Sequence, residues 1–287
     1  MNSPAADGSP LISVIVPTFN SQDFLARALQ SLALQTWRDF EVVLRDGASG
    51  DGTVGLAESF AGRLPALHIE SRVDRSVYDA INGGVAAARG QWCLVLGSDD
   101  CLHAADTLAR AAASLQTSAA SMVYGDVRMM ADNGHRVPPG GRYAGAMPLA
   151  RLLRANICQQ AIFYRRTLFD ELGGFRLDLP VMADWDFNLR VAFRHPTQWL
   201  DQVISDYAAT GMSARSEDSA AEAAIPELIR AELLARAADR STWRLQRVLL
   251  RQADKFRRKR RWRALCRHVA SYVYLLGCRL AIVVRRG

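Results

Sequence analysis

The stretch Trp92-Cys93-Leu94-Val95-Leu96-Gly97-Ser98-Asp99-Asp100-Cys101-Leu102 joins an apolar run to two adjacent acids. The four apolar residues 93–96 have glycines on either side, which is the pattern of a short buried strand. Asp99 and Asp100 therefore follow a strand end, the edge at which open α/β sheets bind ligands. Neighbouring carboxylates there suit a divalent cation that carries a phosphorylated substrate. The alternative is that both acids only shape a turn and cap a helix that begins near Leu102.

Strand and helix patterns alternate through the first half of the chain. Residues 11–16 form a β-branched run typical of a central parallel strand, and an amphipathic helical pattern follows from Asn20 or Ser21 to Leu32. Further strands are expected at 40–44, 67–70 and 93–96, and further helices from 53 toward 60, from 77 to 90 and through 108–115. This alternation predicts a parallel sheet with right-handed crossovers and helices on both faces.

The second half is less regular. Residues 122–130 and 136–143 flank Asp132-Asn133-Gly134, which is a hairpin signal. More strands are expected at 161–164 and 199–207, and helices at 184–193, with Asp184 as the cap, and at 217–240.

Charge divides the chain into two parts. The 287 residues carry a net charge of +7, but residues 244–286 hold 14 Lys or Arg against one acid, Asp254. The rest holds 22 basic and 28 acidic side chains, a net charge of −6. We therefore expect one domain over residues 1–241 and a basic, amphipathic, helical segment over 242–287.

Cysteine and histidine usage gives no sign of a metal or disulfide framework. The five cysteines have no CxxC spacing, and the five histidines show no metal-ligand pairing. Residues 1–10 are small and polar, without a basic and apolar leader, so no signal peptide is expected. Together these features predict reduced thiols and a cytoplasmic protein.

Five segments resemble, in the same order, motifs of the family 2 glycosyltransferases of the GT-A fold. Each motif is weak alone, but their order makes a strong joint signal, and the resemblance covers roughly residues 11–213. The segments are Val14-Ile15-Val16-Pro17-Thr18-Phe19-Asn20, Asp46-Gly47-Ala48-Ser49-Gly50-Asp51-Gly52-Thr53, Asp74-Arg75-Ser76-Val77-Tyr78-Asp79-Ala80-Ile81-Asn82, Gly97-Ser98-Asp99-Asp100, and a stretch from Ala161 through Gly173-Gly174-Phe175 to Ala183-Asp184-Trp185-Asp186.

The resemblance implies a Rossmann-like GT-A fold with a mostly parallel sheet, a donor half over about residues 11–130 and an acceptor half over about 131–241. It implies transfer of a sugar, with inversion, from a nucleoside-diphosphate sugar to a saccharide or polyprenyl-linked hydroxyl. Synthesis of an envelope polysaccharide or glycolipid is the expected setting. The chain lacks the Gln-x-x-Arg-Trp motif of processive synthases, so addition of single sugars is expected.

The donor half would supply side chains that meet at the carboxyl edge of the sheet. By resemblance Thr18 and Asp46 contact the base; a carboxylate accepts the imide N–H of uracil, which favours a UDP-sugar over a GDP-sugar. Asp100 resembles the ligand of Mn²⁺ or Mg²⁺, which would offset charge on the leaving diphosphate. The other implied donor contacts are Pro17, Phe19 as a wall beside the base, Asp99 at the ribose, and Asp79, for which a role in packing or capping its own helix stays open.

The acceptor half would supply the general base that removes the proton of the acceptor hydroxyl. Asp184 occupies the position that resembles this base, and a carboxylate at a helix start is well fixed for the task. The alternative is that Asp184 only caps the helix. Asp186 is the second candidate for the base.

The basic segment suits an anionic membrane surface. Residues 242–263 are helix-compatible and end in a run of Arg and Lys, and 269–284 is apolar but too short to span a bilayer and contains Arg279. We expect peripheral association with the cytosolic face of the inner membrane. A solvated tail is the alternative. Binding of nucleic acid is not expected, because residues 1–243 are acidic overall and do not extend the basic surface of the segment.

Two other function classes remain open at this point. One is a nucleotidyltransferase on a related sheet, which would release pyrophosphate. The other is a non-catalytic module that binds nucleotide sugars and uses its acids only to shape loops.

Overall fold

The computed structural model describes residues 8–130, 137–208, 219–259 and 261–284. The chain divides into two compact units, one of Met1–Pro148 with Asn156–Glu217 and one of Leu149–Ala155 with Asp218–Gly287. The charge pattern placed the boundary after residue 241. In the structure the helix α8 (Ser219–Ala235), which precedes residue 241, belongs to the second unit because it packs against the basic helices α9 (Arg247–Arg258) and α10 (Trp262–Val284).

One nine-stranded sheet forms the centre of the first unit, in the order β3-β2-β1-β4-β8-β6-β9-β5 with β7 beside β6. Strands β3, β2, β1 and β4 are mutually parallel, as the alternating pattern predicted. Beyond them the sheet is mixed, since β8 runs antiparallel to β4 and β6. The strands are β1 (Ile12–Thr18), β2 (Phe40–Asp46), β3 (Leu67–Ser71), β4 (Trp92–Val95), β5 (Cys101–Leu102), β6 (Met122–Met129), β7 (Arg142–Tyr143), β8 (Ile162–Arg165) and β9 (Thr197–Tyr207).

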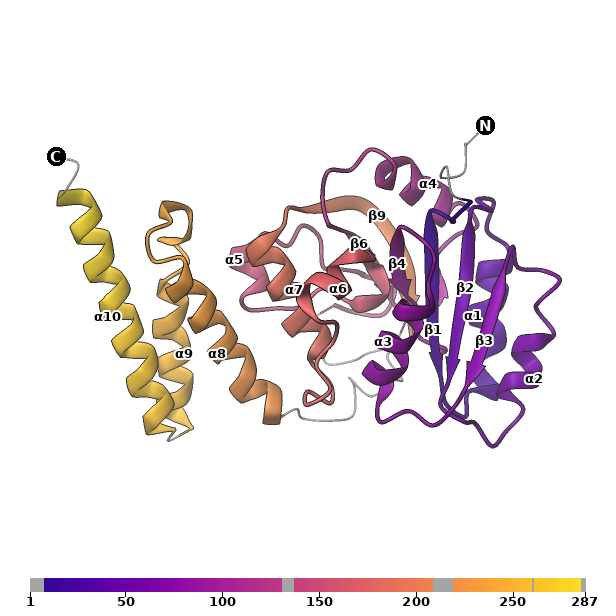
Figure 1. Cartoon of the computed structure of the whole chain (residues 1–287), viewed down its shortest axis with the longest axis horizontal. Coiled ribbons are helices and arrows are strands. Elements are labelled where there is room, and N and C mark those ends of the chain that lie inside the picture. Colours follow the sequence, from indigo (N-terminus) through magenta and orange to yellow (C-terminus); the bar gives the residue numbers. More distant parts are fainter. Residues whose placement is uncertain (1–7, 131–136, 209–218, 260, 285–287) are drawn as a thin grey trace. The chain divides into compact units, whose positions relative to one another are not determined.

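The strand order reverses beside β1. The chain proceeds outward from β1 to β2 and β3, and then returns to place β4 on the other side of β1 (Figure 1). Such a reversal leaves a crevice at the carboxyl ends of the two central strands, where α/β proteins bind ligands. Thr18 and Asp46, the last residues of β1 and β2, are direct neighbours in register.

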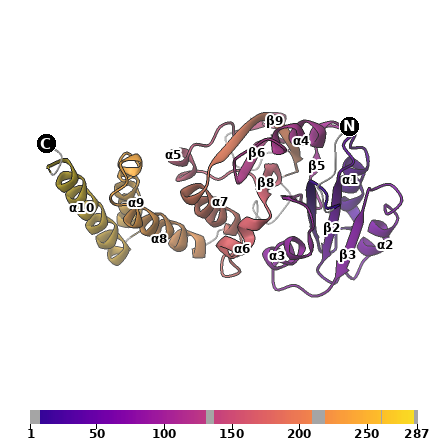
Figure 2. The same ribbon diagram turned by 45° about the horizontal axis from the view of Figure 1, so that its top comes forward.

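Helices cover both faces of the parallel part of the sheet. The apolar side chains of β1 on one face join a cluster with α1 (Gln22–Ala33), α2 (Thr53–Glu58) and α4 (Thr107–Leu115). On the other face α3 (Val77–Ala87) packs against β1 and β2, as Figure 2 shows. A Cβ at Gly84 would come within 2.5 Å of Ile15 Cγ2, so only glycine permits this approach of α3 to the strand.

An aromatic cluster supports the second half of the first unit. It lies beneath α7 (Ala183–Arg194), and the rings of Phe169 and Phe187 stack with centroids 4.7 Å apart. Because the cluster fixes the first turns of α7, it also fixes the acid at position 184. The other members of the cluster are Tyr164, Phe175 and Tyr78, and the neighbouring short helices are η1 (Gln159–Ala161) and α6 (Thr167–Leu172).

Three sequence expectations need correction or limits. No helix begins near Leu102, because Cys101–Leu102 pairs with β9 and α4 starts only at Thr107. Helix α7 begins at Ala183, its N-cap is Met182, and no side chain caps it, so Asp184 is a first-turn residue and not the cap. The expected hairpin turn at residues 132–134 lies outside the described residues, but β7 does pair antiparallel with β6.

The second unit is helical. Its longest elements are α8 (Ser219–Ala235), α9 (Arg247–Arg258) and α10 (Trp262–Val284), of which α9 and α10 lie side by side (Figure 1). Leu249 and Leu275 are fully buried between them. Within the described ranges, no helix is long and apolar enough to cross a membrane. The remaining elements are α5 (Leu149–Leu152) and η3 (Arg240–Thr242).

Candidate active site

Asp46 is a fully buried carboxylate at the end of β2. Thr18 Oγ1 donates to its Oδ1 (3.1 Å), Ser71 Oγ to its Oδ2 (2.6 Å), and both the N–H (2.9 Å) and the hydroxyl of Ser49 also donate to it. Burial alone would raise the pKa of Asp46, but these hydrogen bonds outweigh it and hold the pKa below its ordinary value. Asp46 therefore stays ionised, and a further donor such as a base N–H would require a neighbouring hydroxyl to turn away.

The loops that follow β1 and β2 lock each other in a strained conformation. Asn20 and Ala48 both have positive φ, at 46° and 62°, which is uncommon for residues other than glycine. Asn20 N–H donates to Ser49 Oγ (2.8 Å), and Gly50 N–H donates to Asn20 Oδ1 (3.0 Å). Strain of this kind persists where surrounding contacts over-determine a loop, and it is concentrated at functional sites.

Two sequence-predicted donor residues lie next to these loops. Phe19 directly precedes the strained Asn20, and 65% of it is exposed, although it is aromatic. It lies against Gly47, where an added Cβ would come within 3.2 Å of its ring. Pro17 is half-buried within β1. The exposed ring offers a flat apolar surface beside the carboxyl ends of β1 and β2.

The turn after β4 is tied to α1. Ser98 Oγ lies 3.0 Å from Ser21 Oγ, and Arg27 donates to the backbone oxygen of Asp99 (2.8 Å). Asp100 is buried, and its Oδ1 accepts the N–H of Ala208 (2.9 Å). Burial, followed by the charge of Asp99, raises the pKa of Asp100 to about 7.

Asp99 and Asp100 fit a divalent cation. The raised pKa means that the ionised form of Asp100 is poorly compensated, and a cation would supply the missing positive charge. Among the described residues, no three His, Cys, Asp or Glu side chains form a metal-binding group. Proteins nevertheless often bind Mg²⁺ or Mn²⁺ through only one or two carboxylates, and phosphate and water supply the other ligands.

Asp79 has a different environment from the other predicted donor residues. Arg75 binds it through Nε (3.0 Å) and NH2 (2.9 Å), and these hydrogen bonds lower the pKa of Asp79 to about 2. The N–H of Asp79 also lies 3.3 Å from Ser76 Oγ, the N-cap of α3. Asp79 thus stabilises the start of α3, and a donor would have to compete with Arg75 for its carboxylate.

Asp184 is held by neutral donors. Asn156 Nδ2 donates to its Oδ2 (2.7 Å), and the Tyr78 hydroxyl lies 3.3 Å from its Oδ1. Asn188 Nδ2 donates to Asn156 Oδ1 (2.9 Å), and Asn188 Oδ1 accepts the hydroxyl of the buried Tyr164 (2.7 Å). Burial raises the pKa of Asp184 to about 6, and the hydrogen bonds offset only part of that rise.

Asp186, two residues further along α7, is occupied on both oxygens. It is fully buried, and it pairs with Arg190 (2.7 Å) and Arg176 (3.5 Å). The two candidates for the base thus differ in their partners, since arginines bind Asp186 and neutral groups bind Asp184.

The acids that follow β4 and the acid at the start of α7 lie within electrostatic reach of the same side chains. After burial, the charges of Asp100, Asp99 and Asp184 all raise the pKa of the Tyr207 hydroxyl. Asp184 and Asp100 act in the same direction on the thiol of Cys158, again after burial. The carboxylate pair that follows β4 and the single carboxylate at the start of α7 thus lie close enough to act on the same two side chains, Tyr207 and Cys158.

The sequence patterns missed the residues that orient Asp184. Asn156 lies in an irregular segment 28 residues before Asp184, and Asn188 is fully buried in α7. A buried Asn within an otherwise apolar helix face was the one available signal, because such a group requires a partner. Arg27, which holds the Asp99 turn, gave no signal, since it is an exposed residue of an amphipathic helix.

Comparisons with known proteins give the family. The model of glycosyl transferase family 2 matches residues 13–173. A PGL/p-HBAD biosynthesis glycosyltransferase of Mycobacterium bovis is 46% identical over 205 residues, which is 69% of this chain and 77% of that protein. A glycosyltransferase of Mycobacterium tuberculosis described as uncharacterized is 31% identical over 219 residues, 74% of this chain and 80% of that protein.

Solved structures agree on the fold. The 1–349 fragment of Staphylococcus aureus TarS in complex with UDP-GlcNAc superposes with a TM-score of 0.62 at 22% identity, over 79% of this chain and 66% of that fragment. The chain spans 40% of the length of a longer TarS chain. The mannosyltransferase PcManGT of Pyrobaculum calidifontis, in complex with GDP-Man and Mn2+, superposes with a TM-score of 0.57 at 21% identity over 96% of this chain and 89% of that chain. The fold is thus that of the GT-A glycosyltransferases, as the motifs predicted, and this chain belongs to glycosyl transferase family 2.

Proposed function

We propose that this glycosyltransferase moves a single sugar from a nucleoside-diphosphate sugar to the hydroxyl of a saccharide or polyprenyl-linked acceptor, with inversion. The observation that carries the proposal is the contrast between two kinds of buried acid in the first unit. Asp46 is held ionised by hydroxyl and backbone donors, whereas Asp184 is held by neutral groups with a pKa of about 6. Separated pKa values of this kind are expected of groups that bind and groups that exchange protons.

The donor would lie across the carboxyl ends of β1, β2 and β4. Thr18 and Asp46 would contact the base, Phe19 would stack beside it, and Asp99 would bind the ribose. A uridine donor is proposed, and contact of Asp46 with the imide N–H of uracil would replace one of its present hydroxyl donors. Pro17 would line the same site, and Asp79 would join it only if Arg75 released its carboxylate.

A divalent cation, Mn²⁺ or Mg²⁺, would be held by Asp100 with help from Asp99. Bound there, it would offset the negative charge that develops on the departing nucleoside diphosphate. PcManGT, which shares the fold, is described in complex with GDP-Man and Mn2+, which supports this choice of cofactor. The roles of the protein side chains below do not depend on which of the two ions is used.

Asp184 would act on the acceptor hydroxyl. The hydroxyl oxygen forms a bond to the anomeric carbon while the bond from that carbon to the diphosphate oxygen breaks, and the electron pair leaves with the nucleoside diphosphate. The hydroxyl proton passes to a carboxylate oxygen of Asp184, whose orientation is set by Asn156 and Tyr78. Attack opposite the leaving group inverts the anomeric configuration.

The acceptor is proposed to be a cell-envelope glycolipid or polysaccharide precursor. The relative with 46% identity is named for PGL/p-HBAD biosynthesis, and the basic segment over residues 242–287 suits an anionic surface. We propose that the enzyme works at the cytosolic face of the inner membrane, to which that segment holds it.

A thermal-shift panel tests the proposal. Uridine and guanosine diphosphates and their sugars would be added with and without Mn²⁺, to the wild type and to Asp100→Ala. We expect a Mn²⁺-dependent rise of Tm with a UDP-sugar that Asp100→Ala removes, and release of nucleoside diphosphate when acceptor is added. Release of pyrophosphate would indicate a nucleotidyltransferase, and no shift with any nucleotide sugar would indicate that the acids only shape loops.

A further inference from the structure

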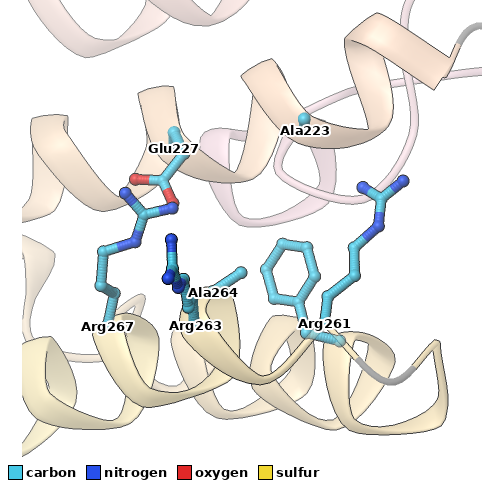
Figure 3. Close-up of a pocket in the computed structure, with 7 residues that line it drawn as sticks. Ala223, Glu227, Arg261, Arg263, Ala264 and Arg267 are labelled. Atoms are coloured by element: carbon cyan, nitrogen blue, oxygen red, sulfur yellow. The ribbon is translucent and has the colours of Figure 1, made fainter.

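Two groups of polar side chains lie outside the residues that the proposed reaction uses. One group surrounds a cavity of about 380 Å³ in the second unit, where Glu227 faces Arg267 at 3.1 Å (Figure 3). Glu227 also pairs with Arg230 (2.8 Å), so this acid is shared by two arginines of its own unit. The other group belongs to residues 142–147 of the first unit, and its hydrogen bonds lead to the proposed base, Asp184.

Asn156 binds Asp184 from a stretch of chain without regular structure. The chain leaves the first unit after Pro148 and re-enters it at Asn156, and residues 156–158 belong to no helix or strand. The hydrogen bonds of a helix or a sheet therefore do not fix the backbone at this point. A small movement of this backbone would weaken the 2.7 Å hydrogen bond from Asn156 Nδ2 to Asp184 Oδ2, because such bonds depend steeply on distance and angle.

The hydroxyl of Tyr143 fixes the backbone of Asn156. Tyr143 Oη donates to the backbone oxygen of Asn156 (2.9 Å), and the direction of this bond follows because a carbonyl oxygen only accepts. Asn188 Nδ2 donates to Asn156 Oδ1 (2.9 Å), which orients the amide so that its N–H₂ group faces Asp184. Asn156 is thus held at its backbone by one residue and at its side chain by another.

Tyr143 is in turn held by Asp126, a buried acid of β6. Asp126 accepts hydrogen bonds from residues on both sides of Tyr143. Arg142 NH2 donates to its Oδ2 (2.6 Å), and the N–H of Gly145 donates to its Oδ1 (2.8 Å). Trp199 Nε1 donates to the same Oδ1 (3.1 Å). The tyrosine therefore extends from a backbone that is fixed at two points, and its hydroxyl can position the group that it binds.

We propose that Tyr143 is a positioning residue for the carboxylate of Asp184: its hydroxyl fixes the backbone of Asn156 and so keeps the Asn156 amide directed at that carboxylate. The inference deepens the proposed function and rests on it, because the position of Asp184 affects transfer only if Asp184 is the base. Tyr143 itself contacts neither donor nor acceptor in this proposal. A hydroxyl that only satisfied a carbonyl oxygen would stabilise the fold without any effect on Asp184.

Two conservative substitutions in the full chain make the comparison. Tyr143→Phe removes the hydroxyl and keeps the ring, and Tyr124→Phe is the matched control. The Tyr124 hydroxyl accepts the N–H of Met147 (2.8 Å), just before the chain leaves the first unit. Both variants thus lose a hydrogen bond to the backbone at one end of the same excursion of the chain, but only the hydroxyl of Tyr143 binds Asn156. Both should fold, because both keep the aromatic ring, and their Tm values check this.

The readout is the pKa of Asp184, followed through the ¹³C chemical shift of its carboxyl group as the pH of the free enzyme is varied. Asp100 also has a raised pKa, so the signal of Asp184 is identified by its loss in Asp184→Asn. Burial raises the pKa of the hydroxyls and the thiol near Asp184, so these groups do not titrate in the same range. They belong to Tyr78, Tyr164, Tyr207 and Cys158.

We expect Tyr143→Phe to raise the pKa of Asp184 by about half a unit, because a loosened Asn156 amide stabilises the ionised carboxylate less. Tyr124→Phe should leave this pKa unchanged. The double variant Tyr143→Phe/Asn156→Ala should match Asn156→Ala alone, because the hydroxyl acts only through that amide. No shift in Tyr143→Phe, an equal shift in Tyr124→Phe, or additive shifts in the double variant overturn the proposal.

The pH profile of the transfer rate distinguishes failure of this proposal from failure of the enzymatic one. If the titration of Asp184 and the acidic limb of the transfer rate both move in Tyr143→Phe, the positioning role and the base role are both supported. If the titration moves and the limb does not, Tyr143 positions Asp184 but Asp184 is not the base. If the titration does not move, the positioning role is wrong whatever the transfer rate does.

Discussion

The proposed donor side and the proposed acceptor side hold an aspartate side chain in opposite ways. At the end of β2, hydroxyl and backbone donors surround Asp46 and keep its pKa low, so its charge is permanent. At the start of α7, Asp184 receives two neutral partners and has a pKa of about 6, so its charge is conditional. The difference teaches that a carboxylate's role here depends on the number of donors around it, because burial acts on both in the same direction.

Within α7 the same contrast predicts opposite effects on stability. Asp186→Asn would leave Arg190 and Arg176 facing an uncharged amide in a buried site, and we expect a loss of about 3–5 kcal/mol in the free energy of unfolding. Asp184→Asn should be at least as stable as the wild type at pH 8, because it removes a charge that burial disfavours. Urea denaturation of both variants makes the comparison. A larger loss in Asp184→Asn would contradict it.

On the donor side, Asp46→Asn should weaken binding of the nucleotide sugar roughly 10- to 100-fold. The new amide N–H₂ would face hydroxyl donors, so hydrogen bonds to a charged group, worth about 1.5–3 kcal/mol, are lost and the neighbouring loop loosens. Isothermal titration with UDP-sugar and Mn²⁺ measures the change. Ser71→Ala, which removes one of the four donors, is the graded control and should weaken binding less. Unchanged affinity in Asp46→Asn would exclude its role at the base.

The pH dependence of the transfer rate should report the ionisation of Asp184. A base must be deprotonated, and the pKa of Asp184 lies at about 6, above its ordinary value of 3.8. The transfer rate should therefore fall about tenfold for each pH unit below 6 and approach a plateau above it. Single-turnover rates at saturating donor and metal give the profile. An acidic limb near pH 4 would mean that the base is a solvated carboxylate.

The smallest effect is expected from Asn156→Ala. Its hydrogen bond favours the ionised form of Asp184, so its loss should raise the pKa of Asp184 and move the acidic limb about one unit to higher pH. The rate on the plateau should fall only a few-fold, because the Tyr78 hydroxyl still contacts the carboxylate. A lower plateau without movement of the limb would show a merely structural role.

The sequence predicted the candidate site best where the site residues directly follow regular strands. The strands around Thr18, Asp46 and the Asp99-Asp100 pair could be predicted because β-branched runs end at polar residues, and parallel order brings those ends together. The mixed half of the sheet could not be predicted in the same way. The pairings of β8 and β9 depend on contacts between distant segments, and no periodicity encodes them.

The partners that surround each acid could also not be predicted from the sequence. Asp184 and Asp186 stand two positions apart, and nothing local says that arginines bind one of them while Asn156 holds the other. Similarly, the motif that contains Asp79 does not reveal that Arg75 occupies its carboxylate. These distinctions arise from tertiary contacts, and they separate the proposed base from a structural ion pair.

The most direct test of the account compares Asp184→Asn with the wild type in two measurements on one preparation. Donor affinity should be unchanged with Mn²⁺ present, while the single-turnover transfer rate should fall by about 10²- to 10⁴-fold, the usual contribution of a general base. If donor affinity is lost together with transfer, or if transfer survives, then Asp184 does not act as the base and the assignment of the two sides is wrong.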